Sequence, residues 1–318
     1  MGLPASGTGA PRRSTRVGRV DEFSGVAVLA GPGGALASRV GGSVDERMAF
    51  QIASGSKQFT ACAVLLLVDR GLVALDDPLV AYLDGGQSGV SVHQLLSHTS
   101  RIGHWETIPG LDLSDLPDAG AVKELIVAAP LGEPGWVYSS PGYVLLAHVV
   151  EAVSGRPYAE FVSSEILEPL GLADTTVAVA PAFAAEGYHG GRPIGGLDLA
   201  AIPGAGDLWS TAADQVRFVR AIHAERRLLS ASSYEVMCTA HGPLDETWRT
   251  EDGWLGGESC GYGVGIGVIG GEPAYFHPGD NSGFRSFRAW LPETDRAAVV
   301  LSNDDACDPL PVLRDLLG

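Results

Sequence analysis

Residues 52–61 read Ile-Ala-Ser-Gly-Ser-Lys-Gln-Phe-Thr-Ala, and the rest of the fold can be worked out from this stretch. From Ser54 to about Arg70 apolar residues recur at helical spacing, and Gly71 follows as a C-cap. On such a helix Lys57 lies one turn after Ser54, on the same face, with about 5–6 Å between the two Cβ atoms. The stretch therefore predicts a helix whose first turn holds a hydroxyl and an amine side by side.

Strand and helix patterns are distributed unevenly around this helix. Strand patterns occur near both ends of the chain, at residues 24–31, 34–40, 262–269, 284–291 and 297–302. Helical patterns fill the section between them, for example at 121–129 and 142–154, and a last helix is expected at 305–317. We therefore expect an α/β (α+β) fold, in which both ends of the chain build an antiparallel sheet and a mostly helical domain is inserted.

The expected domain boundaries follow from these patterns. Residues 1–20 are rich in arginine and predict a disordered, weakly basic arm. Residues 21–75 and 200–318 together predict the α/β sheet domain, and residues 76–199 the helical domain.

Composition and charge narrow the possible partners. The formal net charge is -17, so the protein repels nucleic acid and anionic membranes, and neither is expected as a partner. We find no secretory signal and no membrane-length apolar run, and we expect a cytoplasmic protein that acts on a small molecule, with the oligomeric state left open. The four cysteines lack paired metal spacing and are expected to be reduced thiols, so neither a metal nor a cofactor is predicted.

Ser54 and Lys57 together indicate nucleophilic catalysis. A serine hydroxyl is a poor nucleophile at neutral pH and needs a neighbouring base. A lysine can be that base only when it is partly neutral, and both desolvation and the helix dipole lower its pKa at a helix N-terminus. The alternative is that Ser54 is an N-cap and Lys57 a surface residue. The composition favours catalysis, because Lys57 and Lys123 are the only lysines and arginine does not deprotonate.

Two further short motifs carry residues suited to acyl transfer. The first is Tyr138-Ser139-Ser140, in which a phenol near a cationic lysine can have its pKa lowered and can shuttle a proton. The second is His277-Pro278-Gly279, in which the histidine can bond a substrate carboxylate or carbonyl and the glycine lets a substrate backbone approach closely. Each motif alone is also typical of ordinary packing or of an exposed strand, so the prediction depends on their combination.

In order, spacing and flanking residues, the chain resembles the serine β-lactamase and penicillin-binding-protein superfamily. The resemblance is to the branch of class C β-lactamases, DD-carboxypeptidases, D-aminopeptidases and β-lactamase-type esterases, whose motifs are Ser-x-x-Lys, Tyr-x-Asn and His-x-Gly. It extends from about residue 22 to residue 303 and includes Leu-Leu-Ser-His-Thr-Ser at 95–100 and Asp-Leu-Trp-Ser-Thr at 207–211. It implies a five-stranded antiparallel sheet flanked by helices, a helical domain, and a site between them.

The resemblance also implies roles for individual residues. Ser54 is the nucleophile, Lys57 its activating partner, and Tyr138 the general base for acylation and the acid for the leaving group. The backbone N–H groups of Ser54 and Asp280 form an oxyanion hole. His277 binds the substrate's carboxylate or assists Tyr138.

Several positions depart from the pattern of that branch. Ser140 replaces the usual asparagine, and a hydroxyl lacks the paired donor and acceptor with which an amide recognises acylamino substrates such as β-lactams. Arg101 replaces a glycine, and either Arg101 or His104-Trp105 would hold an anionic or aromatic group if it faced the cleft; a loop with a packed tryptophan is the alternative. The carboxylate of Asp280 would disfavour acidic substrates if it pointed inward.

We therefore expect a serine hydrolase that forms an acyl-Ser54 intermediate from a small ester, lactone or amide. The alternatives are a β-lactamase or DD-peptidase proper, a transacylase in small-molecule biosynthesis, and a non-catalytic binding relative. The intact set of Ser54, Lys57 and Tyr138 argues against the last.

Overall fold

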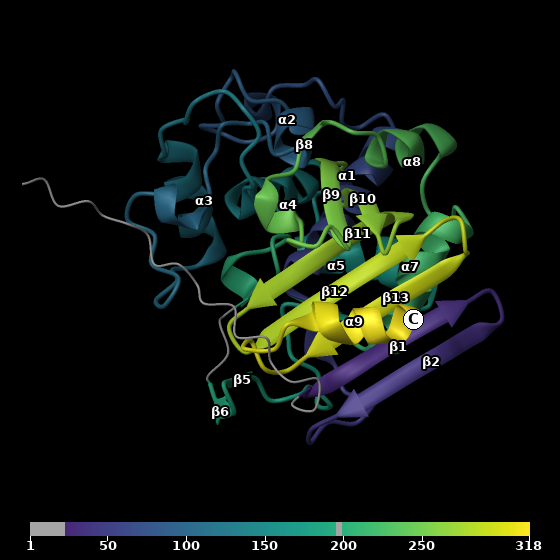
Figure 1. The fold of residues 1–318 in the computed structure, drawn as a ribbon. Coiled ribbons are helices and arrows are strands. Elements are labelled where there is room, and N and C mark those ends of the chain that lie inside the picture. Colours follow the sequence, from purple (N-terminus) through teal and green to yellow (C-terminus); the bar gives the residue numbers. More distant parts are fainter. Residues whose placement is uncertain (1–22, 195–198) are drawn as a thin grey trace, which may run out of the picture.

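The computed structural model describes residues 23–194 and 199–318, so the arm expected at 1–20 lies outside the described residues. Its main feature is an eight-stranded antiparallel sheet in the order β2-β1-β13-β12-β11-β10-β9-β8 (Figure 1). The strands are β1 (Gly25–Gly31), β2 (Gly34–Gly41), β8 (Gly242–Pro243), β9 (Leu255–Cys260), β10 (Gly265–Ile269), β11 (Glu272–Asn281), β12 (Phe284–Leu291) and β13 (Arg296–Ser302). Segments near the two ends of the sequence meet where β1 pairs with β13.

This sheet confirms the expected fold class, but the number of five strands is wrong. The sheet has three strands more than expected, and two of them, β8 and β9, form one of its edges. Strand β9 reads Leu-Gly-Gly-Glu-Ser-Cys, which lacks β-branched residues, so no strand pattern is visible in the sequence. It pairs because glycines let the two backbones meet: Gly257 lies opposite Gly267, where an added Cβ would be 2.0 Å from the Gly256 carbonyl oxygen.

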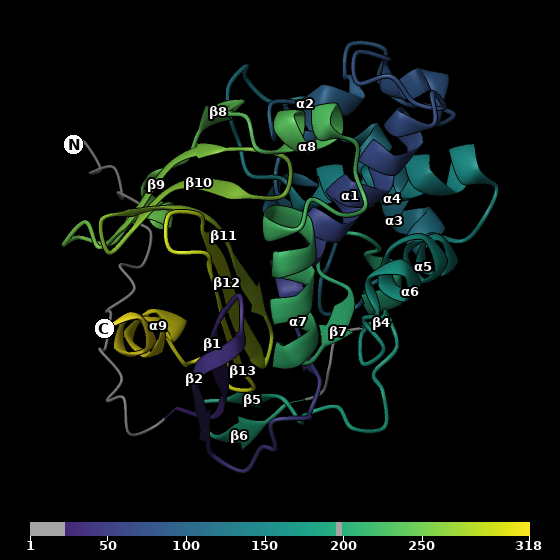
Figure 2. The ribbon, with the colours of Figure 1, turned by 90° about the vertical axis from the view of Figure 1, so that its right-hand side faces the viewer.

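Helices cover both faces of the sheet. Helix α9 (Pro309–Leu317) packs on one face and α7 (Ala212–Val219) on the other (Figure 2). The remaining α-helices are α1 (Ser56–Asp69), α2 (Val92–Leu96), α3 (Ala119–Ala128), α4 (Ser140–Ser154), α5 (Tyr158–Val162), α6 (Glu168–Leu170) and α8 (Ala231–Met237). Most of the helices between α1 and α7 lie beyond α7 from the sheet (Figure 2). This arrangement agrees with the inserted helical section, although the domain boundaries themselves stay a prediction.

Two small sheets connect the helical section to the large sheet. One has the order β3-β7-β4, with β3 at Phe50–Gln51, β7 at Leu208–Ser210 and β4 at Thr176–Val177. The other pairs β5 (Tyr188–His189) with β6 (Arg192–Pro193). Because β3 runs directly into the turn that carries Ser54, its pairing with β7 fixes residues near 207 beside the start of α1.

Helix α1 is the centre of the core. Twelve of its residues, from Ser56 to Leu67, are buried, and it packs against α4. A helix that is buried on every side has no solvent-facing stripe, so a polar side chain on it is held in a low-dielectric environment. Lys57 is one such side chain. Within the described residues no helix has both the length and the apolar character needed to cross a bilayer, and no group of His, Cys, Asp and Glu is arranged to hold a metal.

Candidate active site

Ser54 lies on a short 3-10 turn, Ala53–Gly55, immediately before α1. The preceding Ala53 has a φ of +49°, in the left-handed region that non-glycine residues rarely adopt. The turn is held from two sides, since the Ile52 N–H donates to the Leu208 carbonyl and Ser286 Oγ donates to the Ile52 carbonyl at 2.7 Å. The half-buried hydroxyl of Ser54 is thus fixed on a strained turn at the junction of α1, β7 and β12.

Lys57 is fully buried directly behind Ser54. Its Nζ donates to Ser54 Oγ at 3.1 Å and to the carbonyl oxygen of Ala205 at 2.6 Å. Burial lowers the pKa of Lys57 to about 7, while the nearby carboxyl of Asp207 acts in the opposite direction. A substantial fraction of the amine is therefore neutral near pH 7, as the sequence predicted, and a neutral amine can accept the proton of a serine hydroxyl.

Tyr138 completes the group. Its ring centroid is 5.1 Å from Lys57 Nζ, and its phenol interacts with the nearby hydroxyls of Ser54 and Ser140, which act to lower its pKa. Desolvation raises the pKa of Tyr138, and the interactions with Ser54 and Ser140 oppose this rise only in part. The expectation of a lowered phenol pKa is therefore wrong, because burial outweighs the two hydroxyls and Lys57 is not a permanent cation. Tyr138 is a neutral phenol at rest and is suited to relay a proton.

Two histidines hold Tyr138 and the start of α4. The Ser139 N–H donates to His98 Nδ1 at 3.0 Å, and the His98 ring lies 4.7 Å from the ring of Tyr138. The Ser140 N–H donates to His104 Nδ1 at 3.2 Å. Burial lowers the pKa of both histidines below the usual value, so they act as neutral acceptors. Ser140 is buried against Tyr138 at this helix start.

His277 is in contact with the same group but is not poised as a cation. It is buried in β11, where Nδ1 donates to the Pro278 carbonyl at 2.6 Å, and its ring is 6.3 Å from that of Tyr138. Desolvation and the nearby Lys57 hold the pKa of His277 well below its usual value. A charged contact from His277 to a substrate carboxylate is therefore disfavoured. The position of His277 near the Tyr138 ring agrees with the other expected role, in which His277 assists Tyr138.

Gly279 and Asp280 follow on the same strand. A Cβ at Gly279 would lie 2.4 Å from the Ile52 carbonyl oxygen, so a glycine is needed for β11 to pack against the turn of Ser54. This is a packing reason for the glycine; Gly279 also lines the cavity beside Ser54, and the close approach of a substrate there stays a prediction. The exposed carboxylate of Asp280 is paired with Arg285.

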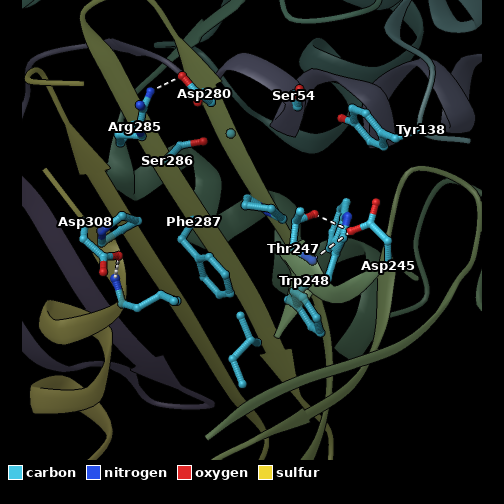
Figure 3. A pocket seen from close by; sticks show the side chains of 16 residues that line it. Ser54, Tyr138, Asp245, Thr247, Trp248, Asp280, Arg285, Ser286, Phe287 and Asp308 are labelled. Carbon is cyan, nitrogen blue, oxygen red and sulfur yellow. Dashed lines mark hydrogen bonds and ion pairs between the residues drawn. The ribbon is translucent and has the colours of Figure 1, made fainter. Parts of the chain in front are cut away.

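A cavity of about 350 Å³ opens beside Ser54. In Figure 3 Ser54 and Tyr138 lie at one side of it and Asp308 at the other. The remaining residues around the cavity are Asp245, Thr247, Trp248, Leu255, Phe276, Pro278, Gly279, Asp280, Arg285, Ser286, Phe287, Pro309 and Leu310. Its walls are thus largely aromatic and aliphatic, with carboxylates at the margins.

Some predicted binding residues do not line this cavity. Trp105 is half-buried in the turn Trp105–Thr107 and packs against His104 and the core, so it serves the loop and does not face the cavity. Arg101 donates to the Gly132 carbonyl at 2.7 Å and braces a loop. Ser140 and His277 also do not line the cavity; Ser140 lies beside Tyr138, and the His277 ring contacts the rings of Tyr138 and Trp248, which do line it.

The sequence did not predict the residues of the large sheet that fix the segments next to Ser54. Buried Arg288 on β12 donates through Nη2 to the Gly55 carbonyl at 2.5 Å and through Nη1 to Gln215 Oε1 at 2.9 Å. Asn281 Nδ2 donates to Gln51 Oε1 and to the Gly206 carbonyl. The available signal at β12 was Arg288, which lies between the apolar residues Phe287 and Ala289 of the strand.

Comparisons with known proteins agree with this geometry. The sequence model of the Beta-lactamase family matches residues 15–315. The chain is 28% identical over 301 residues to the putative penicillin-binding protein PbpX of Bacillus subtilis, covering 88% of this chain and 71% of that protein. It is 35% identical over 200 residues to the esterase EstB of Burkholderia gladioli, covering 53% of this chain and only half of EstB.

Solved structures give the same result. The crystal structure of D-amino acid amidase from Ochrobactrum anthropi, complexed with L-phenylalanine, superposes with a TM-score of 0.79 at 26% identity, covering 93% of this chain and 94% of that one. A penicillin-binding protein from Bacillus halodurans gives a TM-score of 0.79 at 25% identity, with 93% and 97% covered. The relatives named here include an esterase and an amidase, so the chain has hydrolases among its relatives. The chain belongs to the Beta-lactamase family.

Proposed function

We propose that this member of the Beta-lactamase family is a serine hydrolase that forms an acyl-Ser54 intermediate from a small ester, lactone or amide. The observation that carries the proposal is the contact of 3.1 Å between Lys57 Nζ and Ser54 Oγ, inside a core that lowers the pKa of the amine to about 7. A surface lysine beside an N-cap serine would have neither property. The esterase and amidase relatives support the same reaction type.

In the proposed reaction Ser54 Oγ attacks the substrate carbonyl while its proton passes to Lys57 Nζ, directly or through the phenol of Tyr138. The phenol interacts with the Ser54 hydroxyl at the same cavity, so it is placed to relay that proton and to deliver one to the leaving group. Water then attacks the acyl carbon, the bond between that carbon and Ser54 Oγ breaks, and one proton of the water passes along the same path to Ser54 Oγ. We assign the developing oxyanion to the backbone N–H groups of Ser54 and Asp280, because β11 packs against the turn of Ser54.

The cavity indicates the kind of group that the substrate carries. Trp248, Phe276 and Phe287 are apolar walls beside Ser54, and they favour an apolar or aromatic acyl or leaving group. The carboxylates of Asp245 and Asp308 at the margins, together with the net charge of -17, disfavour anionic substrates. We therefore propose neutral or cationic esters and amides with an apolar part.

Intact-mass spectrometry tests the nucleophile. The wild type is incubated with a fluorophosphonate or a p-nitrophenyl ester, in parallel with Ser54→Ala and with Ser232→Ala, a control at an exposed serine. We expect one adduct on the wild type and the control, and none on Ser54→Ala. An adduct that persists on Ser54→Ala, or a wild type that acquires none, would contradict the proposal.

A further inference from the structure

Asp207 is a buried carboxyl group without a hydrogen-bond partner. Its exposed fraction is 0%, and neither carboxyl oxygen makes a hydrogen bond of normal geometry within the described part of the chain. The backbone N–H groups of Gly204 and of Asp207 itself lie near the carboxyl and favour its charged form, but they do not satisfy it. Buried polar groups are normally paired, so such an exception needs an explanation.

The same chain shows what a structural buried carboxylate looks like. Asp214, seven residues further on, is 1% exposed. Its Oδ2 accepts from the Asp174 N–H and from Thr175 Oγ1, and its Oδ1 accepts from Arg217 at 2.7 Å. Asp214 therefore has the partners that Asp207 lacks, and it provides a matched comparison.

The backbone around Asp207 is fixed to α1 and cannot turn the carboxyl toward solvent without breaking several contacts. Lys57 Nζ donates to the Ala205 carbonyl, and Thr60 Oγ1 donates to the Gly204 carbonyl at 2.7 Å. On the other side, the Leu208 N–H donates to Ser56 Oγ at 3.0 Å. The first turns of α1 thus hold residues 204–208 next to Lys57.

Lys57 and Asp207 are surrounded by titratable side chains that are neutral near pH 7. Among these groups of the described chain, Asp207 is therefore the one that can supply a negative charge to Lys57. Lys57 faces the rings of Tyr138 and Tyr143 and interacts electrostatically with three histidines, His98, His104 and His277. Burial raises the pKa of both tyrosines and lowers the pKa of all three histidines, so all five are neutral near pH 7. Tyr158, which faces Asp207 from α5, also has a raised pKa and is neutral.

We propose that Asp207 is a positioning residue for Lys57, a buried counter-charge that stabilises the ammonium formed when the amine takes the proton of Ser54. The inference rests on the proposed function of Ser54 and Lys57. In the step, the O–H bond of Ser54 breaks, an N–H bond forms at Lys57 Nζ, and the serine oxygen bonds to the substrate carbonyl carbon. In its carboxylate form Asp207 neither gains nor loses a proton in this step, and its charge offsets that of the new ammonium.

The two pKa values agree with this role. Burial raises the pKa of Asp207 to about 7, and the charge of Lys57 opposes that rise. The carboxyl in turn opposes the fall in the pKa of Lys57. Removing the carboxylate charge therefore lowers the pKa of the amine further, and the acid limb of the reaction must move to lower pH.

The first test is the pH profile of Ser54 acylation in Asp207→Asn, with Asp214→Asn as the matched control. We expect the acid limb of Asp207→Asn to move down by about one pH unit or more, the usual effect of removing a nearby opposite charge. We also expect its maximal acylation rate to fall at least roughly tenfold. Asp214→Asn should lose stability without moving the limb. An unmoved limb in Asp207→Asn, or an equal movement in Asp214→Asn, would overturn the inference.

The second test does not depend on activity. Because Lys57 and Lys123 are the only lysines, ¹³C-lysine NMR of a Lys123→Arg protein shows the titration of Lys57 alone. We expect Asp207→Asn, or Asp207→Ala if the asparagine variant does not fold, to lower the titration midpoint of Lys57. If Ser54 is acylated but the midpoint is unchanged, the inference about Asp207 fails alone. If the midpoint falls but Ser54 is never acylated, the proposed function fails while the electrostatic coupling stands.

Discussion

The dependence of Ser54 acylation on pH follows directly from the burial of Lys57. If the neutral amine is the base, the rate follows its deprotonated fraction. With a pKa of about 7 that fraction is about 9% at pH 6 and about 91% at pH 8, so the rate should rise roughly tenfold and then level off. An ordinary lysine, with a pKa near 10.4, would be only about 0.4% neutral at pH 8, and its rate would climb roughly a further 70-fold by pH 10.

The burst of p-nitrophenol release in stopped flow measures this step, because it reports acylation before turnover. Circular dichroism at each pH shows that the protein stays folded over the range. Lys57→Arg should abolish the burst at every pH, since a guanidinium does not deprotonate, and Lys123→Arg should leave the profile unchanged. A rate that still climbs above pH 8, or a profile without an acid limb, would refute the assignment of Lys57 as the base.

Three further outcomes are expected. Tyr138→Phe should slow acylation at least roughly a hundredfold, since it removes the proton relay; a near-normal burst would remove Tyr138 from the mechanism. Gly279→Ala should lower both the melting temperature and the acylation rate, because its Cβ would press on the Ile52 carbonyl, and calorimetry that finds no loss would contradict that contact. Leu310→Ala, on the cavity wall, should lower kcat/KM for long-chain relative to short-chain esters roughly tenfold, about 1.4 kcal/mol of lost apolar contact; Leu316→Ala, on the same helix but outside the cavity lining, should leave that ratio unchanged.

The parts of the site that were predictable from the sequence are those set by local geometry. Ser54 and Lys57 meet because one helical turn separates them, and this holds although α1 begins only at Ser56 and Ser54 lies on the turn before it. The hairpin of β1 and β2 is marked by its glycine-rich turn, and β12 begins and ends at the expected residues.

The other parts depend on long-range packing, which no local pattern reports. Arg288 reaches the turn of Ser54 across 233 residues of sequence, and the cavity walls come from several separate segments. The predicted direction of the pKa shift at Tyr138 was wrong. The motif shows that a lysine is nearby, but it does not show how deeply the phenol is buried. His277 was expected to bind a carboxylate or to assist Tyr138, and the strand pattern could not decide between them because it does not show that Trp248 and Tyr138 enclose the His277 ring.

The burial of Lys57 and Asp207 lowers the free energy of unfolding, and this loss is greatest near neutral pH. The folded pKa of Lys57, about 7, lies below its unfolded value of 10.5, so its burial destabilises the fold increasingly as the pH falls from 10.5 toward 7. The folded pKa of Asp207, about 7, lies above its unfolded value of 3.8, so its burial destabilises the fold increasingly as the pH rises from 3.8 toward 7. Both penalties, each of the order of several kcal/mol, are therefore present together around pH 7, the same pH at which the amine changes from ammonium to base. Two apolar side chains of similar volume would avoid both penalties, so packing does not explain why Lys57 and Asp207 are buried together. A proton transfer that needs a desolvated amine and a nearby negative charge does explain it.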